Sequence, residues 1–220
     1  MDDRKIAEVA GATARAGVWS TPTLTIFNRA FAAKESDEQI RARPDWNLMP
    51  ARLRALYLGA RTRYWSPAAL EARTEARRRR YVEVRNGITN SIADSGGKIL
   101  AGSDTPEWFH VYGWALHREL ESLVEAGLTP HQALAAATRN PAEFLGALAE
   151  WGTIETGKRA DLVLVSADPL DDIRNTTRID GVSIGGRWLE QPALERMIQR
   201  AIVRLDGAAP DSLKGTGSRR

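Results

Sequence analysis

The sequence contains no cysteine and only three histidines among its 220 residues. The lack of cysteine excludes disulfide bonds, thiolate metal ligands and thiol nucleophiles, and is compatible with a reducing or an oxidising compartment. No apolar run approaches the roughly 20 residues of a membrane-spanning helix. The start, "MDDRKIAEVAGATARAGV", lacks the basic and apolar regions of a signal peptide. The compartment stays open, and the chain as given is expected to be soluble and cytoplasmic, without a membrane partner.

A strong net charge is also missing. The 31 Lys and Arg residues against 28 Asp and Glu residues leave a formal charge of +3. This is too small a field to indicate a nucleic-acid partner. The apolar share of 43% is ordinary for a folded protein, and the length suits one large domain or a medium domain with a smaller attachment.

The first two thirds of the chain alternate helical and strand patterns. Apolar residues at helical spacing predict a helix over 3–16, and the β-forming stretch "VWSTPTLTIF" over 18–27 predicts a strand. A long helix is expected from the Ser66–Pro67 start signal to residue 95, followed by a short strand in "KILAG". This rhythm predicts an α/β fold.

The remaining third reads as a small β unit. The segments "GTI", "ADLVLV", "GVSI" and "RWL" are predicted strands, and Gly185–Gly186 is a two-residue hairpin signal. Residues 190–205 have the pattern of a closing helix. Residues 206–220 have the composition of a disordered tail.

The stretch "KILAGSDTP" delivers a carboxylate, Asp104, where a buried strand is expected to end. From local composition alone, two roles are open. Asp104 is either a catalytic group or a side chain that caps the following turn.

Three stretches carry a family resemblance: "KILAGSDTP", "LHRELESLVEAGLTPHQALAAATRNPAEFLG" and "GTIETGKRADLVLVSADPLDDIRN". They resemble the amidohydrolase superfamily, in particular its imidazolonepropionase-like branch, over about Ala7 to Leu189. The resemblance implies the C-terminal part of a TIM (β/α)8 barrel over residues 1–150, with "GVWSTPTL" as strand seven and "KILAGSD" as strand eight. Residues 151–189 would then supply the C-terminal strands of a small β-sandwich.

The same resemblance implies chemistry. Members are similar in hydrolysing C–N bonds of small amide, cyclic amide or dipeptide substrates with a water molecule activated by one or two divalent metal ions, most often zinc. The carboxylate after strand eight binds the metal and accepts a proton from that water. Asp104 matches this position, which is the carboxyl end of a barrel strand.

The rest of the family's ligand set has no match here. The family also uses a His-x-His pair after strand one, a carboxylated lysine or a glutamate after strand four, and histidines after strands five and six. A single carboxylate does not hold a catalytic zinc, which typically has three protein ligands. The chain is therefore expected to be a truncated C-terminal portion that is inactive and retains no metal alone, with an N-terminal half in trans or self-association as candidate partners. The alternatives are a non-catalytic binding or assembly module, half of a split enzyme, or a hydrolase rebuilt around Asp104, His110 and His117.

Three further side chains are candidates for lining a substrate pocket: Trp108, His110 and His117. The aromatic loop that holds Trp108 and His110 either lines a pocket or packs as a lid. His117 lies beside Leu116 in a predicted helix, which favours a partly buried, hydrogen-bonded histidine over a substrate-facing one. Asp161, Asp168, Asp171 and Asp172 are interpreted as turn or cap residues.

Overall fold

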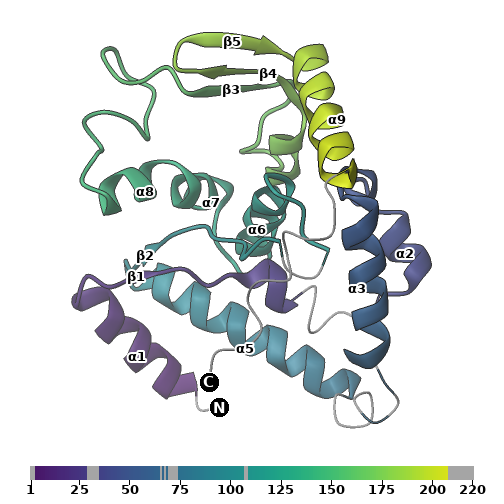
Figure 1. Ribbon diagram of the computed structural model, residues 1–220. Helices are drawn as coiled ribbons and strands as arrows, with labels where there is room; N and C mark the ends of the chain where they lie inside the picture. The colour runs from purple at the N-terminus through teal and green to yellow at the C-terminus, as the bar shows by residue number, and fades with distance from the viewer. Residues whose placement is uncertain are drawn as a thin grey trace, which may run out of the picture.

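The computed structural model describes residues 3–28, 35–64, 66, 68, 74–106 and 109–207, which form a mixed α/β fold (Figure 1). In chain order the elements are α1 (Asp3–Arg15), β1 (Trp19–Ser20), α2 (Asp37–Arg41), the 3-10 helix η2 (Trp46–Leu48), α3 (Ala51–Tyr64), α5 (Glu75–Asp94), β2 (Lys98–Ile99), α6 (Trp114–Glu125), α7 (Pro130–Ala137), α8 (Arg139–Phe144), β3 (Leu162–Val165), the 3-10 helix η3 (Ile173–Thr177), β4 (Ile179–Ile184), β5 (Arg187–Glu190) and α9 (Gln191–Gly207).

A short parallel sheet lies at the centre of the first part. β1 pairs with β2, with Trp19 opposite Lys98 and Ser20 opposite Ile99. The chain between them contains α2, α3 and α5, so the unit is a strand, a helical crossover and a parallel strand. In Figure 1, α1 and α5 lie below the two strands, and α6 to α8 lie above them.

The second edge of β2 is also hydrogen-bonded. Leu100 donates its N–H to Ser20 O toward β1, at 2.9 Å. On the other side, Ala101 N donates to Ala136 O and the side-chain amide of Asn140 donates to Ile99 O, both at 2.8 Å. Backbone groups that an edge strand would leave open are thus satisfied by α7 and α8.

The predicted strand over 18–27 was wrong beyond Ser20. Pro22 has no N–H for a ladder, Thr23 has a φ of +52°, and residues 24–28 form a helical turn. The β-forming side chains over 24–26 therefore belong to a helical turn that follows the strand, and they are buried as part of that turn. The predicted helix over 3–16 is confirmed as α1.

The long crossover helix begins later than predicted. α5 starts at Glu75, where the Thr74 side chain accepts the N–H of Arg77 at 3.3 Å. Residues 67 and 69–73, which include the proposed proline start, lie outside the described residues. The helix ends at Asp94, close to the predicted end.

The main core lies between β2 and the helices that follow it. Its buried members are Leu24, Ile99, Leu120, Leu123, Ala126, Leu128, Ala133, Ala136 and Ile173. Leu123 is fully buried, and burying a leucine side chain is worth about 1.5–3 kcal/mol. Because the core draws on both β2 and α6, it fixes the loop between them at both ends.

A second apolar cluster holds that loop against the crossover. Phe109 is buried with Ile40 and Met49, and its ring packs edge-on against Tyr57 at a centroid distance of 5.4 Å. The Tyr57 hydroxyl donates to Pro106 O at 2.5 Å. The loop after β2 is therefore packed onto α2 and α3.

The C-terminal part forms one antiparallel sheet, in the order β3, β4, β5. The predicted hairpin at Gly185–Gly186 is confirmed, with φ of +55° and +77°, as a type I′ turn requires. The predicted strand at Gly152–Ile154 was wrong, because this stretch is a bend whose Gly152 has a φ of +100°. The closing helix is α9, and residues 208–220 lie outside the described residues.

No helix within the described ranges is both long enough and apolar enough to cross a lipid bilayer.

Candidate active site

Asp104 lies in the loop that follows β2, with an exposed side chain. Because β1 and β2 are parallel, their carboxyl ends and the loops that leave them lie at the same edge of the sheet. Asp104 is thus presented to solvent at the edge where α/β proteins place their ligands.

Three non-glycine residues of the described chain have a positive φ, and all three follow these two strands. They are Thr23 after β1, with +52°, and Asp104 and Phe109 after β2, with +53° and +64°. Aspartate tolerates this region, whereas for a β-branched or bulky residue it is an outlier. Such strain persists only where surrounding structure enforces it, and it gathers at functional sites.

The two loops touch directly at Gly102. A Cβ added to Gly102 would lie 2.5 Å from the Thr21 methyl carbon Cγ2. The glycine of "AGSDTP" is therefore explained by the close approach of the segments that leave β1 and β2.

His110 is buried in the loop after β2, with 3% of its surface exposed. Its Nε2 lies 3.4 Å from Thr25 Oγ1, near the long limit of a hydrogen bond. Its neighbour Phe109 belongs to the second apolar cluster, so this part of the loop packs against the protein. Trp108, the third residue of this aromatic stretch, lies outside the described residues.

A residue that sequence reasoning missed is Glu119 on α6. It is fully buried, and its Oε1 and Oε2 accept the backbone N–H groups of Leu24 and Thr25 at 2.9 and 2.7 Å. The signal was present in the sequence, because Glu119 lies among Leu116, Leu120 and Leu123 on the apolar side of the predicted helix. An acid at such a position indicates a buried carboxylate that needs partners.

His117 faces a different neighbour. Its Nδ1 lies 3.0 Å from Thr176 Oγ1 in η3, and its ring meets Trp114 edge-on at 6.2 Å. Burial lowers the pKa of His117 below its usual value. The side chain links α6 to the C-terminal part of the chain, as expected for a partly buried histidine of a helix.

A buried ion pair joins the crossover to α6. Arg118 donates to Asp45 Oδ1 at 3.1 Å, and the Asp45 side chain is 1% exposed. Asp45 Oδ2 and Arg118 Nε are buried without a hydrogen-bond partner in the described structure. This pair fixes the position of α6 relative to η2.

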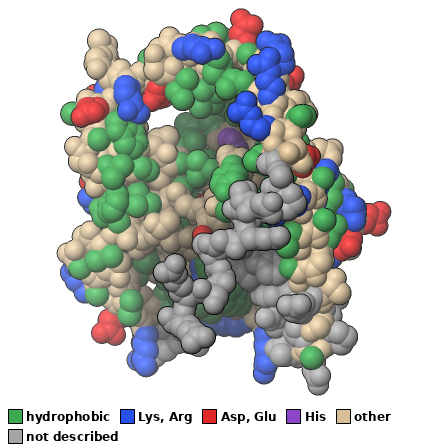
Figure 2. Space-filling model, viewed as in Figure 1, with side chains coloured by type: hydrophobic (Ala, Val, Ile, Leu, Met, Phe, Trp, Pro, Cys, Tyr) green, Lys and Arg blue, Asp and Glu red, His purple; other side chains and the backbone are tan. Residues whose placement is uncertain are grey.

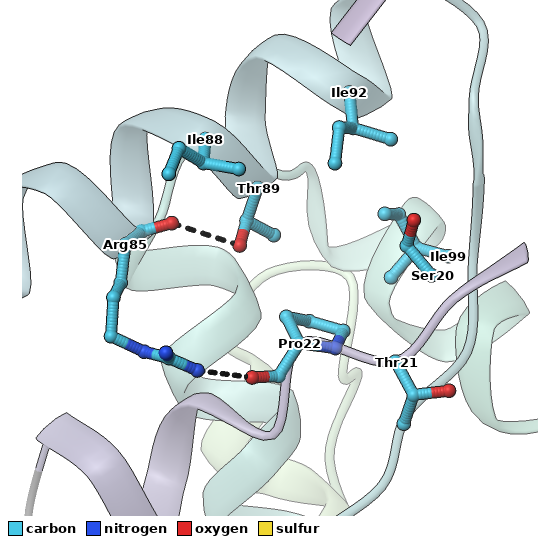
Figure 3. Close-up of a pocket in the computed structure, with 8 residues that line it drawn as sticks. All are labelled: Ser20, Thr21, Pro22, Arg85, Ile88, Thr89, Ile92 and Ile99. Carbon is cyan, nitrogen blue, oxygen red and sulfur yellow. Dashed lines mark hydrogen bonds between the residues drawn. The ribbon is translucent and has the colours of Figure 1, made fainter. Parts of the chain in front are cut away.

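A cavity of about 140 Å³ lies between α5 and the two strands (Figure 3). Ile88 and Ile92 of α5 and Ile99 of β2 line it, and Arg85 at its rim donates to Pro22 O at 2.6 Å. The Arg85 guanidinium also stacks over the Phe27 ring at 4.0 Å. None of Asp104, His110 and His117 lines this space, which is an apolar packing gap behind the strands.

The described residues do not fit a complete metal centre. They contain no group of three or more His, Cys, Asp or Glu side chains placed to hold an ion. A catalytic zinc typically needs three protein ligands, whereas this edge of the sheet offers the Asp104 carboxylate. The two histidines proposed for a rebuilt site contact different parts of the chain. Nε2 of His110 lies near the Thr25 hydroxyl, and Nδ1 of His117 lies near the Thr176 hydroxyl.

Of the four aspartates predicted to act in turns or caps, Asp161, Asp168 and Asp172 do so. Asp161 accepts the N–H of Gly185 at 2.7 Å, and Asp168 accepts the N–H of Leu170 at 2.8 Å. Asp172 caps η3 by accepting the N–H of Arg174 at 2.9 Å, and hydrogen bonds from the Arg174 side chain and from this N–H lower the pKa of the Asp172 carboxyl. Their hydrogen bonds explain these acids without a metal.

Solved structures share this fold. The chain is similar to bottromycin amidohydrolase, with a TM-score of 0.66 and 24% identity over 91% of this chain and 42% of that one. It is also similar to a Xaa-Pro dipeptidase with bound methionine, with a TM-score of 0.53 and 22% identity over 83% of this chain and 37% of that one. For the ochratoxinase of A. niger the TM-score is 0.53 and the identity 19%, over 84% of this chain and 35% of that one. The chain thus spans about two fifths of the length of these proteins.

No curated protein matches the sequence significantly. The model of the amidohydrolase family matches residues 5–189, which include β1, β2, the Asp104 loop and the C-terminal sheet. The chain therefore belongs to the amidohydrolase family.

Proposed function

We propose that this chain forms one part of a metal-dependent amidohydrolase active site that hydrolyses C–N bonds in small amide, cyclic amide or dipeptide substrates. Asp104 is the residue that carries the proposal. Its carboxylate is exposed at the carboxyl end of β2, on a left-handed backbone conformation, beside the end of the parallel strand β1. The family match and the likeness to an amidohydrolase and a dipeptidase favour this class of substrate.

In this proposal β1 and β2 are the seventh and eighth strands of a TIM barrel, and Asp104 is a metal ligand and the proton acceptor. The support is the parallel pairing, the helical crossover between the strands, and the position of Asp104 after the second of them. β3 to β5 are the C-terminal strands of a small β-sandwich.

We further propose that catalysis needs metal ligands from additional polypeptide, and that this chain alone is inactive. The donor set of the described residues supports this, because it offers Asp104 without a cluster of partners. The C-terminal sheet supports it too. Its side chains Leu162, Val163, Leu164, Ile184 and Trp188 are 38–59% exposed, and in Figure 2 hydrophobic side chains lie among charged ones at the top, where this sheet lies. Apolar surface of this kind favours packing against an N-terminal half in trans or a second copy.

The first test is metal content and turnover of the purified chain. After incubation with zinc and desalting, elemental analysis should find far less than one metal ion per chain. Panels of Xaa-Pro dipeptides, N-acyl amino acids and lactams should show no turnover. One zinc per chain with hydrolysis that Asp104→Asn abolishes would contradict the need for additional ligands.

The second test asks whether Asp104 works when ligands are supplied. The part of bottromycin amidohydrolase that this chain does not match is joined to the chain, and zinc binding and hydrolysis are measured. Zinc binding and turnover should appear in the chimera and be lost in Asp104→Asn. Asp168→Asn, a matched aspartate of the turn before η3, should leave both unchanged. A folded, zinc-loaded chimera whose hydrolysis survives Asp104→Asn would refute the role of Asp104.

A further inference from the structure

We propose that Glu119 is a positioning residue that holds the loop after β1 in place and, through Thr25, sets the position of His110 in the loop that carries Asp104. The inference rests on the proposed function in one respect, which is that the loops after β1 and β2 border an active site. The contacts themselves belong to this chain.

Both oxygens of the Glu119 carboxylate contact the start of one short segment. Both oxygens accept backbone N–H groups of adjacent residues, Leu24 at 2.9 Å and Thr25 at 2.7 Å. These N–H groups start the helical turn over 24–28 and have no earlier turn to bond to. Hydrogen bonds to an ionised acceptor are stronger than neutral ones, so the pair fixes both the position and the direction of the turn.

Thr25 connects this anchor to the other loop. It is fully buried, its N–H is held by Glu119, and its hydroxyl lies 3.4 Å from His110 Nε2. A shift of the turn therefore moves the Thr25 hydroxyl relative to the imidazole. Through Thr25, α6 controls the ring that follows Asp104 by six residues in the sequence.

The surrounding backbone shows why such an anchor is needed. Thr23, immediately before the anchored pair, has a φ of +52°, which is costly for a β-branched residue. A strained residue keeps its conformation when the atoms on either side are fixed. The Glu119 contacts supply that fixation on the C-terminal side.

The test observes His110 directly by NMR in the full chain, which has only three histidines, so His117 and His131 serve as internal references. The ¹⁵N chemical shifts of the imidazoles are measured at fixed pH in Glu119→Gln, Thr25→Val and Thr25→Ser, with His110→Gln for assignment. Glu125→Gln is the matched control, because Glu125 lies exposed on the same helix. The measurement needs neither metal nor substrate. The positioning role of Glu119 can therefore be refuted while the proposed function stands, and the proposed function can be refuted while the positioning role stands.

Glu119→Gln keeps the shape of the side chain and replaces one acceptor oxygen by a donor, so the contact to one N–H is lost. We expect His110 Nε2 to shift in Glu119→Gln and in Thr25→Val, while Thr25→Ser and Glu125→Gln leave it at the original position. A merely structural role predicts otherwise: Glu119→Gln would lower the melting temperature and leave the His110 signal unmoved, and that outcome would overturn the proposal. If Glu119→Gln does not fold, the Thr25 pair decides alone, since equal His110 spectra of the valine and serine variants would also overturn it.

Discussion

Gly152 should be among the least replaceable residues of this fold. Its φ of +100° would cost an alanine about 1–2 kcal/mol. An added Cβ would also lie 2.5 Å from Ala142 Cβ and 3.1 Å from Thr138 O, both in or next to α8. Overpacking against such neighbours costs typically 1–3 kcal/mol. Gly152→Ala should therefore destabilise the protein by about 2–5 kcal/mol, which for a chain of this size lowers the melting temperature by roughly 4–20 °C.

Gly157 provides the control that separates the two costs. Its φ of +92° is similar, but nothing lies within 4 Å of an added Cβ. Gly157→Ala should thus show the backbone cost alone, about 1–2 kcal/mol. Urea unfolding followed by circular dichroism gives both free energies of unfolding. Equal losses in the two variants would refute the close approach of Gly152 to α8.

The remaining predictions concern the site and its support. Gly102→Ala places a Cβ 2.5 Å from the Thr21 methyl group and should cost about 1–3 kcal/mol in urea unfolding, a loss that Thr21→Ser in the same chain should reduce; no recovery would argue against the contact. Arg118→Met leaves the buried Asp45 carboxylate unpaired and should cost about 3–5 kcal/mol, with partial recovery on adding Asp45→Asn; a neutral single variant would contradict the buried pair. Because burial lowers the pKa of His117 in the folded state, protons bind preferentially to the unfolded state as the pH falls below about 6.5, and stability is lost from there down toward the folded pKa. His117→Gln should flatten this part of the melting-temperature profile between pH 5 and pH 8, and an unchanged slope would exclude His117 as its source.

Local signals in the sequence predict local structure well. The hairpin at Gly185–Gly186 follows from two residues that accept positive φ. The capping of α7, where the Thr129 side chain accepts the N–H of Gln132, likewise needs only residues three apart. The position of Asp104 after a short strand is also local, since "KILAG" leads directly into it. These features form under the control of neighbours in the sequence.

One prediction that failed and one that stayed open depend on distant partners. The end of the strand expected over 18–27 is a helical turn over 24–28, and Glu119, 95 residues from Leu24, accepts the backbone N–H groups at the start of this turn. The fate of His110 was left open between pocket and packing for the same reason, since its partner Thr25 is 85 residues away. No property of the nearby residues encodes these contacts. Only the acid at position 119, among leucines, hinted that a buried partner existed.

The distance between Glu119 and the turn it anchors also governs how the chain can fold during synthesis. Ribosomes add about 5–20 residues per second, so the segment 24–28 is made roughly 5–20 s before the carboxylate that holds it. The time between the synthesis of β1 and that of β2, its partner in the parallel sheet, is almost as long. During this interval the apolar side chains of Leu24 and Ile26 have no native core to enter. We therefore expect the segment 24–28 to reach its native conformation only after α6 has been synthesised.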